Sequence, residues 1–184
     1  MRVISGTAKG VSLKTPDGLS TRPTADRVKE ALFSIIQFEI PGAKVLDLFG
    51  GSGQLGIEAL SRGCKSAVFV DHSPVACKLI EENLKRTKLQ EQGRVVRSDY
   101  LSYLKNCKEK YDIILLDPPY AEKFLENALN FITEIDILQT NGIIVTERPV
   151  EKDLLLNFPG YSRSRDYKYG STLLAVYRKE DSKE

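Results

Sequence analysis

The chain has 184 residues, of which 41% are hydrophobic and 28% are charged, with 13 glycines and 8 prolines. This length and composition favour one compact domain, and they exclude a collagen, a low-complexity disordered chain and a disulfide-rich mini-protein. The cysteines Cys64, Cys77 and Cys107 lie far apart and form no CxxC pair, which argues against a disulfide framework and a thiolate zinc site. We therefore expect a reducing, cytoplasmic environment.

No segment is typical of export or of a membrane span. The N-terminus has no apolar core, and the longest aliphatic run, residues 113–116, is far shorter than the roughly 20 residues that a membrane helix needs. The single histidine, His72, leaves little material for a His-based metal site or a Ser-His-Asp triad. We expect no metal and no membrane partner.

The net charge of +2 is unevenly distributed. Residues 1–24 carry four basic residues against one acidic residue, and residues 161–179 carry five against one. Two basic segments around a more acidic middle are typical of a rim that binds a polyanion, although ordinary surface lysines and arginines would give the same count. The candidate RNA-binding residues are Arg2, Lys9, Arg22, Arg163 and Arg165.

The first elements in chain order are a hairpin and a helix. Glycines and a Pro-Asp-Gly triplet divide residues 2–20 into short strands, so residues 1–23 are expected to form a small N-terminal β-hairpin appended to a single domain of residues 1–184. From Thr24 to Phe38 the apolar residues recur at helical spacing, and Pro41 ends the pattern. The charged residues Arg27 and Lys29 of this helix either bind phosphates or belong to its solvated face.

An alternation of strands and helices follows. Strands are expected at residues 44–48, 66–70, 94–98, 111–116 and 142–146, and helices at residues 54–62, 74–89, 100–107 and 124–132. This order predicts an α/β fold with a parallel sheet that is covered on both faces. Residues 161–168 and 172–177, joined through Gly170, predict an antiparallel C-terminal hairpin.

A glycine-rich loop follows the first strand. Gly51, Gly53 and Gly56 satisfy the pattern GxGxxG, and Asp71 ends the second strand, where a carboxylate can accept both hydroxyls of a ribose. The alternative is a packing turn without a ligand. Asp47 at the start of the loop would repel a dinucleotide pyrophosphate and attract the ammonium of a methionine moiety, which favours S-adenosylmethionine over NAD.

The fourth strand ends in Asp117-Pro118-Pro119-Tyr120, hereafter the DPPY motif. An exocyclic base amine is a poor nucleophile because its lone pair is delocalised into the ring. Acceptors on its hydrogens, here the Asp117 carboxylate and the Pro118 carbonyl, would orient it toward a methyl donor, and Tyr120 would stack on the base. A simple proline-rich strand exit is the alternative.

These motifs resemble the class I S-adenosylmethionine-dependent methyltransferases that act on amino groups. Residues 22–33, RPTADRVKEALF, are similar to the signature of the bacterial 16S rRNA (guanine(966)-N(2))-methyltransferase family, and the resemblance extends from residues 2–6 to residues 169–174. It implies a Rossmann-like, mostly parallel sheet. It also implies that the substrate is small-subunit ribosomal RNA, either free or within an assembling subunit.

The same resemblance assigns roles to the candidate residues. It implies that Asp47, Gly51 and Gly53 surround the methionine moiety, Asp71 the ribose, and Asp99 the adenine, while the DPPY motif holds the guanine. Phe49, His72 and Tyr100 are further candidates for the cofactor pocket. The alternatives that involve no ligand are a loop position for Asp99, a core position for Phe49 and a partly exposed structural position for His72.

One departure and three alternatives remain. Val11 stands where family members commonly carry a basic residue, which puts in doubt how much the first hairpin contributes to RNA affinity. The alternative functions are methylation of another amine, such as adenine N6 or a protein amide, a nonenzymatic RNA-binding role in assembly, and a nicotinamide-dependent oxidoreductase.

Overall fold

A computed structural model describes residues 1–16, 23–119, 123–151, 158–164 and 166–180, with the backbone alone for residues 23–25. The helices in this part are α1 (Pro23–Ile35), α2 (Gln54–Ser61), α3 (Pro74–Thr87), α4 (Tyr100–Asn106) and α5 (Phe124–Ile135). The strands are β1 (Lys44–Asp47), β2 (Ser66–Asp71), β3 (Gly93–Arg97), β4 (Tyr111–Leu116), β5 (Leu138–Pro149), β6 (Tyr161–Arg163), β7 (Tyr167–Tyr169) and β8 (Thr172–Lys179).

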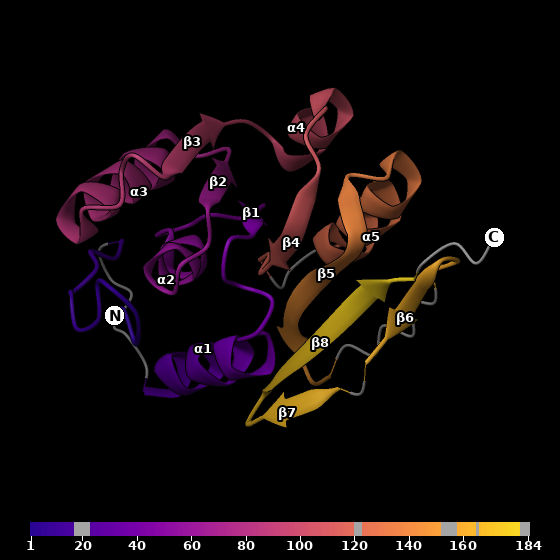
Figure 1. The fold of residues 1–184 in the computed structure, drawn as a ribbon, viewed down its shortest axis with the longest axis horizontal. Coiled ribbons are helices and arrows are strands. Elements are labelled where there is room, and N and C mark those ends of the chain that lie inside the picture. Colours follow the sequence, from indigo (N-terminus) through magenta and orange to yellow (C-terminus); the bar gives the residue numbers. More distant parts are fainter. Residues whose placement is uncertain (17–22, 120–122, 152–157, 165, 181–184) are drawn as a thin grey trace.

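The strands form one mixed sheet in the order β3-β2-β1-β4-β5-β8-β6, and β7 also pairs with β8 (Figure 1). The first five of these strands are parallel, and β8 is antiparallel to β5, β6 and β7. Apolar side chains from the two faces of the sheet form two core clusters, one with α1, α2 and α3 and the other with α4 and α5. The predicted Rossmann-like sheet with an antiparallel end is confirmed.

The element boundaries differ from the predicted ones where strand pairing or solvent exposure determines where an element ends. Helix α1 ends at Ile35, short of Phe38, whose side chain is 87% exposed. Strand β5 is longer than predicted because its second half continues along β8, as far as the pairing of Pro149 with Thr172. The segment predicted as one strand at residues 161–168 forms two short strands, β6 and β7, which pair with different parts of β8.

Residues 1–16, the N-terminal segment, double back as predicted, but their regular pairing is limited to one antiparallel bridge between Arg2 and Ser12. Part of the segment's backbone bonds to α2 instead. The Glu58 carboxylate accepts the backbone N–H groups of Ile4 (2.8 Å) and Ser5 (3.0 Å). Backbone groups that bond to α2 are not available for a ladder, so the hairpin has little strand character.

A buried ion pair between Lys29 and Glu58 joins α1 to α2 next to the N-terminal segment. Lys29 is only 2% exposed, its Nζ donates to the Arg2 carbonyl at 2.6 Å, and it lies 3.8 Å from the Glu58 carboxylate. Burial lowers the pKa of Lys29, and the Glu58 charge opposes this effect. Arg62 also donates to Glu58, at 2.7 Å. Both sequence interpretations of Lys29, a phosphate ligand and a solvated residue, were wrong, because the side chain is buried against a carboxylate.

The register of the sheet brings three acidic side chains to one edge. Asp47 ends β1 and pairs with Phe69 of β2 and Leu115 of β4, so the next residues of those strands lead directly to Asp71 and Asp117. The carboxyl ends of parallel strands share an edge, which is where open α/β sheets bind ligands. Among the described helices, none is long and apolar enough to cross a bilayer.

Candidate functional site

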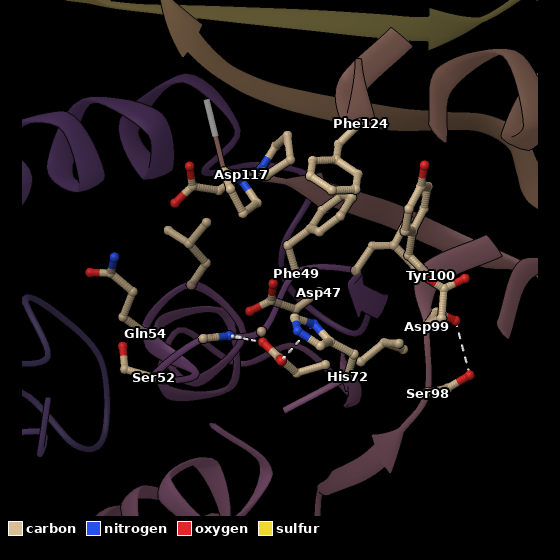
Figure 2. A pocket seen from close by; sticks show the side chains of 18 residues that line it. Asp47, Phe49, Ser52, Gln54, His72, Ser98, Asp99, Tyr100, Asp117 and Phe124 are labelled. Carbon is tan, nitrogen blue, oxygen red and sulfur yellow. Dashed lines mark hydrogen bonds and ion pairs between the residues drawn. The ribbon is translucent and has the colours of Figure 1, made fainter. Parts of the chain in front are cut away.

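A cavity of about 920 Å³ opens at the carboxyl ends of β1, β2, β3 and β4 (Figure 2). This volume is in the range of cofactor and substrate pockets. The residues that line the cavity are Asp47, Leu48, Phe49, Gly50, Gly51, Ser52, Gln54, Leu55, Val70, Asp71, His72, Ser98, Asp99, Tyr100, Asp117, Pro118, Pro119 and Phe124. Of the predicted cofactor residues within the described part, Gly53 alone is missing from this lining.

The glycine loop, residues 49–56, has a backbone that requires its glycines. Gly51 (φ 54°) and Gly53 (φ 78°) adopt left-handed conformations, and a Cβ on Gly56 would lie 2.2 Å from the Phe69 ring. Gly53 is the N-cap residue of α2, and it shapes the loop without lining the cavity. The GxGxxG pattern therefore marks a backbone turn that only glycines allow.

Asp71 fixes the loop and still has acceptor capacity. Its Oδ2 accepts the Gly51 N–H at 2.9 Å, and its Oδ1 accepts the Ser73 N–H at 2.9 Å. A carboxylate offers about four lone-pair sites, so each oxygen can accept one more hydrogen bond from a ligand. This arrangement suits the two neighbouring hydroxyls of a ribose.

Asp47 is a buried carboxylate in the wall of the cavity. It is 1% exposed, its Oδ2 accepts the Gly56 N–H at 3.0 Å, and its Oδ1 is buried without a hydrogen-bond partner among the described residues. Burial raises the pKa of Asp47 to about 7, with smaller contributions from the nearby Asp117 and Asp71 charges. An unpaired buried acceptor beside other carboxylates fits a cationic ligand group that donates hydrogen bonds.

Residues 117–119 of the DPPY motif line another part of the cavity. The Asp117 side chain is part of the cavity wall, as Figure 2 shows, and burial raises the pKa of Asp117 to about 6. Pro118 is buried and Pro119 is exposed, while Tyr120 lies outside the described residues. Two consecutive prolines have fixed φ angles and no N–H donors, so this turn offers acceptors to a ligand.

Three aromatic rings form a wall next to Asp47. The Phe49 ring lies 5.2 Å from that of Tyr100 and 6.3 Å from that of Phe124, and the last two are 5.6 Å apart (Figure 2). Phe49 packs against the second core cluster and also lines the cavity. It is therefore both a core residue and a candidate residue of the cofactor pocket. Phe124 was not identified as a site residue from the sequence. Its position at the start of the helix after the DPPY motif was the signal that could have indicated it.

Asp99 and His72 lie at the rim. Asp99 caps α4, with its Oδ1 accepting the N–H groups of Leu101 (3.0 Å) and Ser102 (3.1 Å), so the loop aspartate has a structural function in addition to lining the cavity. The side chain of His72 is 84% exposed, and its Nδ1 lies 3.6 Å from Asp71. Gln54 and Ser98 also line the cavity, and nothing in their spacing singled them out.

The predicted RNA-binding residues have different surroundings. Arg2 and Lys9 are exposed on the N-terminal segment. Arg163 is 15% exposed and donates two hydrogen bonds to Asp166, at 2.6 and 2.7 Å, which makes it less available to a phosphate than expected. Arg22 and Arg165 lie outside the described residues. In the part of the chain that the structure describes, no three His, Cys, Asp or Glu side chains are grouped as metal ligands would be.

Comparisons with known proteins identify relatives along the whole chain. Residues 1–178 match the family model described as "Conserved hypothetical protein 95". The chain is 42% identical to "Putative rRNA methyltransferase YlbH" of Bacillus subtilis over 182 residues, which cover 97% of this chain and 99% of the relative. It is 33% identical to "Ribosomal RNA small subunit methyltransferase D" of Escherichia coli over 180 residues, which cover 98% of this chain and 90% of the relative.

A solved structure agrees with this relationship. "Putative methyltransferase yhhF" from Escherichia coli superposes with a TM-score of 0.89 at 31% identity, covering 98% of each chain. The glycine loop, Asp47, Asp71 and residues 117–119 thus lie on a fold that is shared over nearly the whole chain. The family resemblance predicted from the sequence is confirmed: the chain belongs to the Conserved hypothetical protein 95 family, and the relatives that match it include rRNA methyltransferases.

Proposed function

We propose that this protein transfers a methyl group from S-adenosylmethionine to the exocyclic N2 amine of a guanine in small-subunit ribosomal RNA. Methylation of ribosomal RNA with S-adenosylmethionine is supported by the relatives, and the guanine N2 target is the finer part of the proposal. The observation that carries it is the position of residues 117–119 of the DPPY motif, which follow β4 and line the same cavity as Asp47 and Asp71.

The cavity residues fit the parts of S-adenosylmethionine. When bound, this cofactor supplies an electrophilic methyl group on a sulfonium sulfur. The unpaired Oδ1 of Asp47 is suited to the methionine ammonium, and the two oxygens of Asp71 are suited to the ribose hydroxyls. Asp99 and the wall of Phe49 and Tyr100 are suited to the adenine.

Asp117 and the carbonyl of Pro118 would accept the two hydrogens of the guanine N2 amine. These acceptors orient the nitrogen lone pair along the line of attack and stabilise the positive charge that develops on it. As the N–C bond forms and the S–C bond breaks, the surplus proton passes to Asp117 or to water. With a pKa of about 6, Asp117 is mostly ionised at neutral pH and can accept that proton. Tyr120 is expected to stack on the flipped base.

Binding of the cationic cofactor should become tighter as the pH rises from 5 to 8. The pKa of Asp47 is raised to about 7, so below that pH this residue is increasingly protonated and loses its attraction for a positive group. We expect the Kd to rise by up to about tenfold per pH unit below pH 6, since one pKa unit corresponds to about 1.4 kcal/mol. Calorimetric titrations at several pH values measure this slope.

Asp47→Asn is the matched control for the pH dependence, because it keeps the shape of the side chain without a titrating group. This variant should bind weakly with a flat profile across the same pH range. A wild-type Kd that stays constant between pH 5 and pH 8 would exclude Asp47 as the partner of a cationic group.

The DPPY motif would also suit another amine, such as adenine N6 or a protein amide. Parallel assays with small-subunit rRNA, DNA and protein substrates separate these activities. A catalytically competent protein that methylates rRNA supports the proposal, whereas methylation confined to DNA or protein contradicts it. Failure to bind S-adenosylmethionine while retaining RNA affinity would indicate the nonenzymatic assembly role instead. Tighter binding of NAD than of S-adenosylmethionine in a thermal-shift comparison would indicate an oxidoreductase.

RNA affinity should fall steeply with salt, because basic residues on the surface release counterions from the phosphate backbone. Between about 50 and 200 mM monovalent salt we expect a loss of at least tenfold, while cofactor affinity changes much less. Filter binding of small-subunit rRNA and calorimetry of the cofactor provide the two curves. Unchanged RNA affinity after combined Arg2→Ala and Lys9→Ala substitutions would remove the N-terminal segment from the interface.

The substrate is either free rRNA or rRNA within an assembling subunit. In both cases the enzyme works in the cytoplasm, where bacterial ribosomal subunits are assembled, and this agrees with the cysteine usage of the chain. Comparing methylation rates on deproteinised rRNA and on isolated small subunits decides between the two substrates.

A further inference from the structure

One buried side chain connects the N-terminal segment to the glycine loop. Asn83 on α3 is 0% exposed. Its Oδ1 accepts the Lys14 N–H at 2.8 Å, and its Nδ2 donates to the carbonyls of Lys14 (3.0 Å) and Ser52 (2.9 Å). A single amide therefore satisfies backbone groups of two segments that are far apart in sequence.

The bond to Ser52 reaches directly into the cofactor site. Ser52 lies between Gly51 and Gly53 and lines the cavity, as Figure 2 shows. The preceding residue, Gly51, donates its N–H to Asp71, which is the proposed ribose ligand. Movement of the Ser52 carbonyl would therefore alter the part of the loop that orients Asp71. Loop glycines with positive φ angles have no side chains to hold them, so the position of the loop depends on such backbone bonds.

The other end of the connection is a segment with exposed basic residues. Lys14 belongs to the same N-terminal segment as Arg2 and Lys9, which are exposed and are proposed to contact RNA. Two additional contacts hold this segment against α3 without touching the glycine loop: the Lys14 Nζ pairs with Glu82 at 2.6 Å, and the Arg86 Nε donates to the Ser12 carbonyl at 3.1 Å. Asn83 differs from them because it contacts both segments.

We propose that Asn83 is a positioning residue that couples RNA binding at the N-terminal segment to cofactor binding at the glycine loop. RNA that orders the segment would hold Asn83 in place and thereby fix the Ser52 carbonyl and the loop. Since coupling between two binding sites is reciprocal, the bound cofactor strengthens RNA binding by the same factor. This proposal rests on the proposed function, because it requires that the segment binds RNA.

The coupling is measured with S-adenosylhomocysteine, which does not react. In the wild-type protein, a saturating amount of small-subunit rRNA should lower the Kd for S-adenosylhomocysteine by about fivefold or more. In Asn83→Ala this ratio should fall toward 1, although the Ser52 Oγ contact with Met1 Sδ at 3.5 Å remains. The matched control Arg86→Ala removes a bond to the same segment from the same helix and should keep the wild-type ratio. Loss of fold stability alone would not change a ratio of two Kd values measured on folded protein.

Several outcomes would overturn the coupling. These are a wild-type ratio of 1, a wild-type ratio retained in Asn83→Ala, and an equal loss of the ratio in Arg86→Ala. The methylation assay on rRNA tests the proposed function separately, so a protein that methylates rRNA without any coupling refutes this inference alone. A protein that neither methylates nor binds rRNA refutes the proposed function, and with it the coupling.

An experiment on the wild-type protein avoids dependence on a variant that fails to fold. Hydrogen exchange at the Lys14 amide, which is bonded to Asn83, should slow several-fold when S-adenosylhomocysteine is added. The Gly10 amide is the internal control, because it bonds to the Val3 carbonyl within the same segment, and its exchange should change less. Equal exchange at Lys14 with and without the ligand would overturn the proposal.

Discussion

Replacing Asp117 with alanine should lower the rate of methyl transfer about 10²–10³-fold, by analogy with the loss of one preorganised electrostatic contact. The proposed partner of this carboxylate is the amine of the target base, so the Kd for S-adenosylmethionine should change far less. Removing the Asp117 charge should also lower the pKa of Asp47, because the two carboxylates repel each other. Single-turnover methylation with saturating cofactor measures the chemical step directly.

Asp117→Asn is the matched control for this variant. Its amide has nearly the same shape and keeps one acceptor oxygen for the base amine, but it carries no negative charge and cannot accept the surplus proton. We therefore expect a rate between those of the wild type and Asp117→Ala. Transfer at the wild-type rate in Asp117→Ala would remove the DPPY motif from the site that holds the base.

Replacing Asp71 with alanine should weaken cofactor binding by about 1.5–3 kcal/mol, which corresponds to a Kd roughly 10–150 times higher. The variant loses a charged acceptor for the ribose hydroxyls. It also loses the acceptor for the Gly51 and Ser73 N–H groups, so the loop itself becomes less ordered. Calorimetric titration with S-adenosylhomocysteine measures the change without turnover.

Two further variants separate the ribose contact from the support of the loop. Asp71→Asn keeps an acceptor for one backbone N–H and should lose less affinity than Asp71→Ala. Ser73→Ala keeps the backbone N–H that Asp71 accepts and removes only the hydroxyl that caps α3, so its Kd should stay close to that of the wild type. An Asp71→Ala protein with the wild-type Kd would show that Asp71 does not contact the ligand.

The fold could be predicted because its main signals are local. Alternating apolar strands and helices with clear caps, such as Ser73 before Pro74, define the parallel sheet and therefore the edge where Asp47, Asp71 and Asp117 meet. Their positions follow from the rule that parallel strands end at the same edge. Pairing with β8 decides the length of β5, and no periodicity within residues 138–149 indicates where that partner ends.

The parts that were not predicted depend on contacts between distant residues. Glu58 binds the N–H of Ile4, which is 54 positions away, and Asn83 binds Lys14, which is 69 positions away. In the sequence, Lys29 and Glu58 are ordinary charged residues of amphipathic helices, and their burial becomes visible only when α1, α2 and the N-terminal segment pack together. The polar supports of the glycine loop could not be found from spacing for the same reason.

The most direct test of the central claim is the identity of the methylated nucleoside. Small-subunit rRNA from cells that lack this gene is incubated with the purified protein and isotope-labelled S-adenosylmethionine, digested to nucleosides and analysed by mass spectrometry. We predict that the label appears in N2-methylguanosine, and that Asp117→Ala gives almost none in the same time. Label in N6-methyladenosine, or an rRNA that remains unlabelled while the protein binds the cofactor, would contradict the assignment.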